Sequence, residues 1–154
     1  LSIEWFDSLS WAISCAMIAF NFYDKYLWKY MPGEQTPQIF GEYTAYCESS
    51  FQGTTKYESS VKIKQSLSNI KVIETFADGS FCESISASLA QLNVNGNWTL
   101  CYTYQTHPTF RPTDDMHFGT ALLTLHSNGD LIGSYYTNRL EQTKGNMHLK
   151  RKYT

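Results

Sequence analysis

Two histidines and one aspartate, His107, Asp115 and His117, come nearest in this sequence to a catalytic or metal-binding cluster. A histidine beside a carboxylate can bind a metal ion or move a proton at neutral pH. Their spacing matches no zinc motif, and the chain has no Gly-x-Ser-x-Gly turn, phosphate-binding loop or cysteine with an activating neighbour. We expect His117 to hold the long loop of residues 107–115 in place through Asp115. The sequence therefore predicts a binding module with no catalytic residue, metal or cofactor, rather than an enzyme.

Polar and aromatic side chains recur at every second position of three later runs, as they do on one face of a β-strand. The three faces are Trp98–Leu100–Tyr102–Tyr104–Thr106, Phe118–Thr120–Leu122–Thr124 and Gly133–Tyr135–Thr137–Arg139. If these faces are internal, a buried Arg139 requires an anionic partner, because desolvating a lone guanidinium is very costly. That partner is either Glu74, or another carboxylate, or a ligand phosphate. The tyrosines either pack as core with a solvated hydroxyl or form platforms for stacking bases.

Four dipeptides divide the second half of the chain into strand-length runs: Asp78-Gly79, Asn95-Gly96, Asn128-Gly129 and Lys144-Gly145. Such pairs favour the positive backbone angles of tight hairpin turns. The predicted strands are residues 39–49, 54–67, 69–77, 80–92, 97–106, 117–127, 130–140 and 145–153. The fold class is therefore mainly β, an eight-stranded antiparallel up-and-down β-barrel that holds either side chains alone or one small ligand. Strand counting places the loop 107–115 at the barrel end opposite the linker.

Residues 1–30 precede the barrel and carry no charge from Ser8 to Tyr23. A transmembrane helix needs about 20 predominantly apolar residues, and aromatic residues suit both bilayer interfaces. We expect a hydrophobic transmembrane anchor over 1–30, truncated upstream of Leu1, a linker over 31–38 and a ligand-binding barrel over 39–154. The alternative for the first segment is an amphipathic helix packed on the barrel or on another chain. Lys25 and Lys29 follow the uncharged run, which would place the barrel in the cytoplasm.

The balance of charge limits the class of partner. Twelve Lys and Arg stand against 14 Asp and Glu, which argues against a general DNA or RNA groove that works by displacing counterions. A small anionic ligand held by one or two basic groups is compatible with this balance. The four cysteines show no paired CxxC spacing, and we expect them to be reduced.

Five segments together resemble a known family. They are Gly41-Glu42-Tyr43, residues 84–89 (SISASL), 100–104 (LCYTY), 115–120 (DMHFGT) and 133–139 (GSYYTNR). Their order, and their position after a hydrophobic segment, resemble the membrane-anchored β-barrel effectors of bacterial cyclic-oligonucleotide-based antiphage signalling (CBASS). These are the SMODS-associated two-transmembrane β-strand-rich effectors, or CD-NTase-associated protein fifteen.

The resemblance implies an effector of antiphage defence that is functionally paired with a nucleotidyltransferase. Its cytosolic barrel would bind a cyclic dinucleotide, form a homo-oligomer and disrupt the lipid of the bacterial inner membrane. The family has two membrane helices, whereas one hydrophobic segment is present here. For such a ligand, arginines would meet the phosphates, threonines would assist and bases would stack on tyrosines. The expected ligand-binding residues are Tyr102, Tyr104, Thr106, Arg111, Thr120, Tyr135 and Arg139.

Two other functions fit an eight-stranded barrel. A lipocalin-like small-molecule carrier is one, since Gly41-Glu42-Tyr43 is similar to the Gly-x-Trp opening of that fold. A carrier should have a mostly apolar lumen, whereas Arg139 and many hydroxyls are predicted inside this one. The other is a membrane-tethered structural adaptor with a packed, ligand-free barrel, in which substitution of Arg139 would change stability alone.

Overall fold

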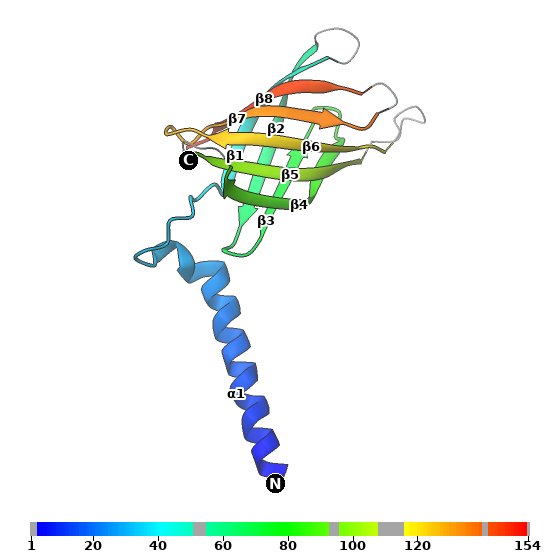
Figure 1. Ribbon diagram of the computed structural model, residues 1–154. Coiled ribbons are helices and arrows are strands. Elements are labelled where there is room, and N and C mark those ends of the chain that lie inside the picture. Colours follow the sequence, from blue (N-terminus) through cyan, green and yellow to red (C-terminus); the bar gives the residue numbers. More distant parts are fainter. Residues whose placement is uncertain (1–2, 51–54, 93–95, 108–115, 140–141, 154) are drawn as a thin grey trace. The chain divides into compact units, whose positions relative to one another are not determined.

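The computed structural model describes residues 3–50, 55–92, 96–107, 116–139 and 142–153. The chain forms two compact units. One consists of Leu1–Gln38 with Ser66–Ser68, and the other of Ile39–Gln65 with Asn69–Thr154. The first unit is helical and the second is a β-barrel (Figure 1).

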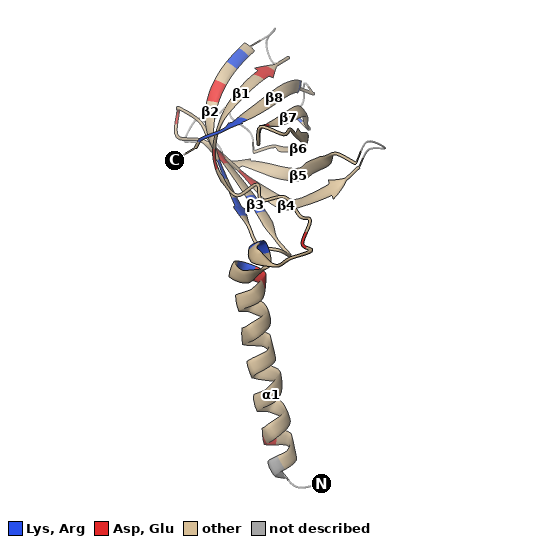
Figure 2. Ribbon diagram, turned by 90° about the vertical axis from the view of Figure 1, so that its left-hand side faces the viewer, with Lys and Arg blue, Asp and Glu red and all other residues tan. Residues whose placement is uncertain are grey.

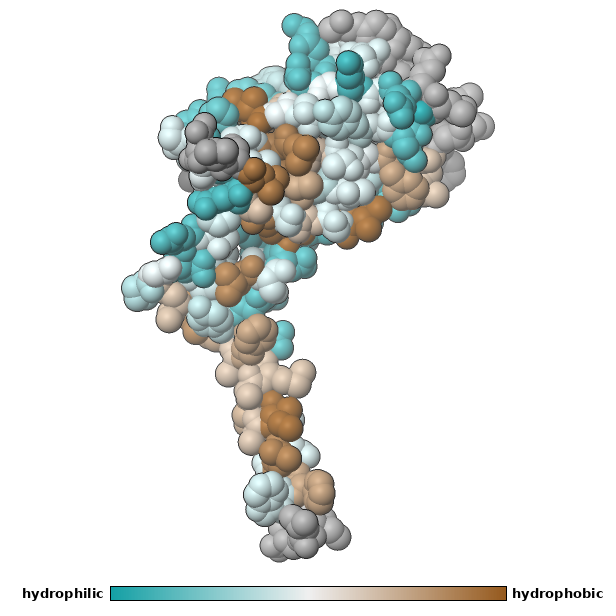
Figure 3. Space-filling model, viewed as in Figure 1, coloured by the Kyte–Doolittle hydropathy of each residue, from teal (hydrophilic) through white to brown (hydrophobic). Residues whose placement is uncertain are grey.

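The helical unit begins with α1 (Ile3–Phe22), which continues into a π-helical turn (Tyr23–Leu27) and a 3₁₀ turn (Trp28–Tyr30). Beyond Asp7, α1 carries no charged side chain (Figure 2). Hydrophobic residues lie on the surface of this helix (Figure 3). Among the exposed side chains are Trp11 at 73% and Ile18 at 70%. The segment Ser66–Ser68 belongs to the same unit. It contacts the helical segment through the backbone N–H of Ser68, which donates a hydrogen bond to Asp24 Oδ1 at 2.8 Å.

No helix in the described part of the chain is both long enough and apolar enough to cross a lipid bilayer. The prediction of a transmembrane helix over residues 1–30 is therefore not met. The α-helix ends at Phe22, and it includes Asp7 and several hydroxyl side chains within its length. Two of these, Ser10 and Ser14, donate hydrogen bonds to the carbonyl oxygens of the residues four positions earlier.

Eight antiparallel strands form the second unit and confirm the predicted barrel. They are β1 (Gly41–Ser49), β2 (Thr55–Gln65), β3 (Ile70–Thr75), β4 (Phe81–Gln91), β5 (Trp98–His107), β6 (Phe118–Leu125), β7 (Leu131–Thr137) and β8 (Lys144–Arg151). Each strand pairs with the next in sequence, and β8 pairs with β1 to close the ring (Figure 1).

The turn dipeptides are confirmed at two hairpins and wrong at one position. Gly79 and Gly129 have φ angles of +84° and +83°, as tight turns require. Asn95 lies outside the described residues, although Gly96 has a φ of +69°. Gly145, in contrast, lies within β8 and pairs with Ser49 and Tyr135. Glycine is required at position 145, because a Cβ atom there would collide with the Glu48 carbonyl oxygen and the Tyr135 ring.

The barrel interior changes character along its axis. Toward the end where β1 begins, it is filled by fully buried apolar side chains, among them Tyr43, Val61, Leu100, Leu123 and Leu149. Toward the end where β1 finishes, the buried side chains include polar ones. These are Ser49, Ser59, Glu74, Ser84, Thr106, His117, Thr137 and Thr143. The interior is thus a packed core at one end and a polar chamber at the other.

The inward face predicted for the sixth strand is wrong. Phe118 and Leu122 are 40% and 39% exposed, whereas Gly119, Ala121 and Leu123 are buried. Register explains this arrangement, because Tyr104 of β5 lies opposite Gly119 and Tyr102 lies opposite Ala121. Small residues on β6 make room for the large rings of β5. The inward faces predicted for β5 and β7 are confirmed by the burial of Tyr102, Tyr104, Tyr135 and Thr137.

Candidate functional site

A cavity of about 480 Å³ occupies the polar end of the barrel. Its walls come from strand ends and connections on every side of the ring. The lining residues that carry polar or aromatic groups include Tyr57, Glu74, Cys82, Tyr104, Thr106, His117, Tyr135, Thr137 and Arg139. Small-molecule sites typically have volumes of about 300–1,000 Å³, so this space is large enough for a ligand.

A chain of polar contacts positions the cation of the cavity. Arg139 follows β7, and its Nε–H donates to His117 Nε2 at 3.3 Å. That ring nitrogen is therefore an acceptor, and the neutral imidazole carries its proton on Nδ1. The His117 ring orients the Arg139 side chain through this hydrogen bond. Because the ring is neutral, it does not neutralise the positive charge of the guanidinium.

Thr106 extends this chain across β5. Its Oγ1 lies 3.1 Å from His117 Nε2 and 3.1 Å from Cys82 Sγ. The Thr106 hydroxyl therefore contacts both the imidazole and the thiol. These contacts connect β4, β5 and the two segments that hold His117 and Arg139. The Arg139 side chain is therefore positioned by hydrogen bonds from several strands.

Glu74 is a buried acidic residue in the lining of the cavity. It lies on β3 and is 6% exposed, and its Oε1 accepts a hydrogen bond of 2.5 Å from Ser59 Oγ. Burial raises the pKa of Glu74 to about 7, against an ordinary value of 4.5, although the Ser59 contact opposes the rise. This carboxyl group therefore changes its charge near neutral pH.

The cysteine and tyrosine side chains near Glu74 are uncharged at neutral pH. Burial, as the largest cause, raises the pKa of both Cys47 and Cys82 to about 12. It also raises the pKa values of Tyr57, Tyr102 and Tyr104. The two thiols are thus protonated and poorly nucleophilic at neutral pH. Within the described part of the chain, no group of three or more metal-ligating side chains occurs.

Two tyrosine rings of the cavity wall lie over glycines of the neighbouring strand. Tyr104 pairs with Gly119 across β5 and β6, and Tyr135 pairs with Gly145 across β7 and β8. A Cβ at either glycine would collide with the ring of its partner. The glycines therefore let both rings lie close to the sheet. Tyr135 also accepts a hydrogen bond of 3.3 Å from the hydroxyl of Tyr57 on β2.

The structure brings together four of the seven predicted ligand-binding residues. Tyr104, Thr106, Tyr135 and Arg139 all line the cavity. Tyr102 lies beside the cavity lining, fully buried, and its hydroxyl donates to Met147 Sδ at 3.6 Å.

Of the other two predicted residues, only Thr120 is described, and it does not line the cavity. Thr120 lies on the outer face of β6, where its Oγ1 is 3.4 Å from Thr103 Oγ1. Arg111 lies outside the described residues.

The sequence also predicted contacts for His117 and Arg139. Asp115 lies outside the described residues, so the expected contact with His117 falls there as well. Among the described residues, His117 contacts Thr106 and Arg139. Within the described residues, no ion pair joins Arg139 to Glu74.

The sequence analysis considered Glu74 only as a partner for Arg139, and it did not include Glu74 or Tyr57 among the expected ligand-binding residues. A signal for both existed, because alternation places Glu74 on the same face as Val72, and Tyr57 on the same face as Val61.

A closed antiparallel barrel with a polar cavity at one end defines a ligand-binding β-barrel. The family model described as "Cap15, cyclic dinucleotide receptor domain" matches residues 34–151, which is most of the chain. The chain therefore belongs to this family of CBASS effectors, and the resemblance seen in the sequence is confirmed. None of the curated proteins matches the chain.

Proposed function

We propose that the cavity at the polar end of the barrel binds a cyclic dinucleotide. The observation that carries this proposal is the Arg139–His117 contact, which points a positively charged group toward a cavity lined by tyrosines. A guanidinium is suited to phosphate because its N–H donors match the phosphate oxygens in pairs. Membership in a cyclic dinucleotide receptor family supports the same ligand class.

In this proposal the hydroxyls of Thr106 and Thr137 assist Arg139 at a phosphate. The rings of Tyr104 and Tyr135 offer their faces to the bases, and each stack contributes about 1–3 kcal/mol. A carrier of apolar cargo fits this chamber poorly, because a cation and a carboxyl group both line it.

Calorimetry of the full chain tests the proposal. Cyclic di-GMP, cyclic di-AMP and cyclic di-UMP are titrated into the protein, with the linear dinucleotide pGpG as the control for ring closure. We expect at least one cyclic dinucleotide to bind, and pGpG to bind more weakly. Absence of binding by all three cyclic compounds would contradict the proposal.

We further propose that ligand binding makes the protein self-associate and disrupt the bacterial inner membrane, with the barrel in the cytoplasm and α1 in contact with lipid. The exposed apolar side chains of α1 support a lipid contact, because water-exposed surfaces of that kind are usually covered. In this scheme a paired nucleotidyltransferase makes the ligand, and neither DNA nor RNA is a partner.

Membrane permeability of cells that produce the full-length protein tests this second step. The protein is produced with a nucleotidyltransferase that makes cyclic dinucleotides, and then with a catalytically inactive form of that enzyme. Dye entry should require the active enzyme. Equal dye entry in both strains would contradict a ligand-triggered effector.

A further inference from the structure

Glu74 and Arg139, two of the charged residues that line the cavity, lie on opposite walls of the barrel; Glu58 and Asp78 line it as well. Glu74 belongs to β3, and Arg139 directly follows β7. In the closed order β1 to β8, these two strands are four positions apart, so they face each other across the ring. The cavity therefore has a basic wall and an acidic wall, both lining the same space.

Within the described residues, uncharged side chains surround Glu74. The groups that face it are Ser59 and Tyr57 of β2, Cys47 of β1, Cys82 of β4, and Tyr102 and Tyr104 of β5. All of these are uncharged at neutral pH. Among the described ion pairs of the barrel, none includes Glu74. An unpaired buried carboxylate is costly, so its position on a cavity wall requires an explanation.

We propose that Glu74 accepts hydrogen bonds from the donor edge of one base of the bound cyclic dinucleotide, and thereby favours guanine. This inference rests on the proposed function of the cavity. It assigns the phosphate to the basic wall and a base to the acidic wall. Ser59 holds one carboxyl oxygen at 2.5 Å, which fixes the orientation of the group that reads the base.

Guanine is favoured because of its arrangement of donors. Its Watson–Crick edge carries two adjacent donors, N1–H and the N2 amino group, which match the two oxygens of a carboxylate. Adenine has one amino donor beside a ring acceptor, and uracil has one N–H between two carbonyl oxygens. Adenine and uracil would each place an acceptor atom opposite a carboxylate oxygen. Two acceptors that face each other form no hydrogen bond, which reduces affinity.

Proton exchange on binding reports directly on this role. The pKa of free Glu74 is about 7, and hydrogen bonds from a base would lower it. Binding below pH 7 must then release a proton, and affinity must rise as pH increases toward 7 and level off above it. If the phosphate anion instead favoured the charged form of His117, that ring would take up a proton from solvent, and binding would have the opposite sign of proton exchange.

Calorimetry of the wild-type full chain at pH 6 and pH 8, in buffers of different ionisation enthalpy, makes this measurement without any variant. Cyclic di-GMP should bind more tightly than cyclic di-AMP or cyclic di-UMP, and should release a proton at pH 6 but not at pH 8. The Glu74→Gln variant should bind cyclic di-GMP about 10–100-fold more weakly and release no proton. Glu42→Gln is the matched control, because it removes an exposed carboxylate from the outer face of β1 and should retain both the affinity and the guanine preference.

Three results would overturn this inference while leaving the proposed function intact. They are equal binding of the three cyclic dinucleotides, absence of proton release at pH 6, and unchanged cyclic di-GMP affinity in Glu74→Gln. Absence of binding by every cyclic dinucleotide would instead count against the cavity as their site.

Discussion

Ser59 donates a hydrogen bond to Glu74 Oε1 across 2.5 Å, between two neighbouring strands inside the barrel. This hydrogen bond favours the ionised carboxyl group, but burial outweighs it and raises the pKa to about 7. The folded protein therefore retains a proton that the unfolded chain, with an ordinary pKa of 4.5, has already lost. The position of Glu74 thus reduces the stability of the free protein at neutral and alkaline pH.

The Glu74→Gln variant should be stabilised relative to wild type at pH 8, and by much less at pH 5. Below pH 4.5 the carboxyl group is protonated in both states, and no penalty exists. Stability falls as pH rises from 4.5 through 7, and above 7 the full penalty of about 3 kcal/mol applies. A glutamine side chain does not ionise, so the substitution removes this penalty. Urea unfolding of both proteins at pH 5 and pH 8 gives the two differences in free energy.

The control for this prediction is Glu48→Gln, which removes an exposed carboxylate from the outer face of β1. Glu48 lies 3.6 Å from Lys56, and its side chain is 44% exposed. Such a surface pair contributes about 0–1 kcal/mol, so the change should be small at both pH values. If the two variants respond alike to pH, burial of an ionised Glu74 is not the cause.

Most of the barrel was predictable from local sequence patterns. Two features depend only on residues close together in the chain, and they can therefore be predicted from the sequence. They are the turns at Asp78-Gly79 and Asn128-Gly129 and the alternating burial along β2 and β5. The face of β6 was not predictable in this way. Its run Gly119–Leu125 has apolar residues at both even and odd positions, and only pairing with Tyr102 and Tyr104 decides which side is internal.

The candidate site was predictable in part for the same reason. Alternation was enough to place Tyr104, Thr106 and Tyr135 inside. The His117–Arg139 contact joins residues 22 positions apart, and the opposition of Glu74 and Arg139 depends on ring closure. Neither follows from a local pattern. The same holds for Gly145, which reads as a turn residue but serves the close approach of Tyr135.

Arg139→Gln should weaken binding of the tightest cyclic dinucleotide about 10–100-fold, because hydrogen bonds to charged groups contribute about 1.5–3 kcal/mol. The dependence of affinity on salt should also decrease, since one cation no longer meets the ligand. Calorimetry at two salt concentrations measures both effects. Lys62→Gln is the matched control, because Lys62 is 57% exposed and pairs with Glu42 on the outer face. Equal losses in the two variants would show that overall charge, rather than Arg139, matters.

Gly119→Ala should disturb the cavity through Tyr104. The added Cβ would collide with the phenol ring and with the backbone carbonyl of Tyr136, so the ring must move into the chamber. We expect a loss of about 1–3 kcal/mol in stability, together with weaker ligand binding. Thr120→Ala, one residue along on the outer face of β6, should leave the affinity unchanged. Denaturation and calorimetry of both variants test this. Wild-type affinity in Gly119→Ala would contradict a role for Tyr104 in the wall.

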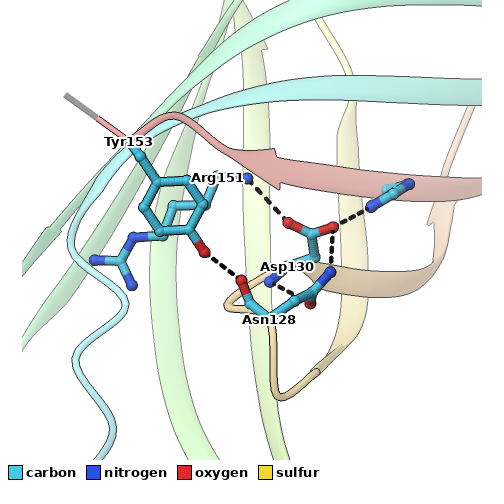
Figure 4. Close-up of polar contacts among 5 residues, drawn as sticks. Asn128, Asp130, Arg151 and Tyr153 are labelled. Carbon is cyan, nitrogen blue, oxygen red and sulfur yellow. Dashed lines mark hydrogen bonds and ion pairs between the residues drawn. The ribbon is translucent and has the colours of Figure 1, made fainter.

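At the opposite, packed end of the barrel, Asp130 joins the β6–β7 turn to β8 (Figure 4). Its Oδ1 accepts from the backbone N–H of Arg151 at 3.1 Å, and its Oδ2 lies 2.9 Å from His148 Nε2. Arg151 in turn donates to the Phe40 carbonyl at 2.9 Å, which ties the end of β8 to the segment before β1. The Asp130 contacts therefore help to close the ring.

Asp130→Ala should destabilise the barrel by about 1–3 kcal/mol at pH 7, because it removes hydrogen bonds to a charged and buried group. Burial opposes ionisation, but hydrogen bonds from His148, Arg151 and Asn128 outweigh it and lower the pKa of Asp130 below 3.8. Its stabilisation is therefore present above pH 3.8 and is lost as pH falls through the lower folded value. Urea unfolding at pH 7 and pH 3 measures the change, with Glu42→Gln as an exposed carboxylate control. A difference between wild type and Asp130→Ala that stays constant down to the acid unfolding limit would mean that the charge of Asp130 contributes nothing to closure.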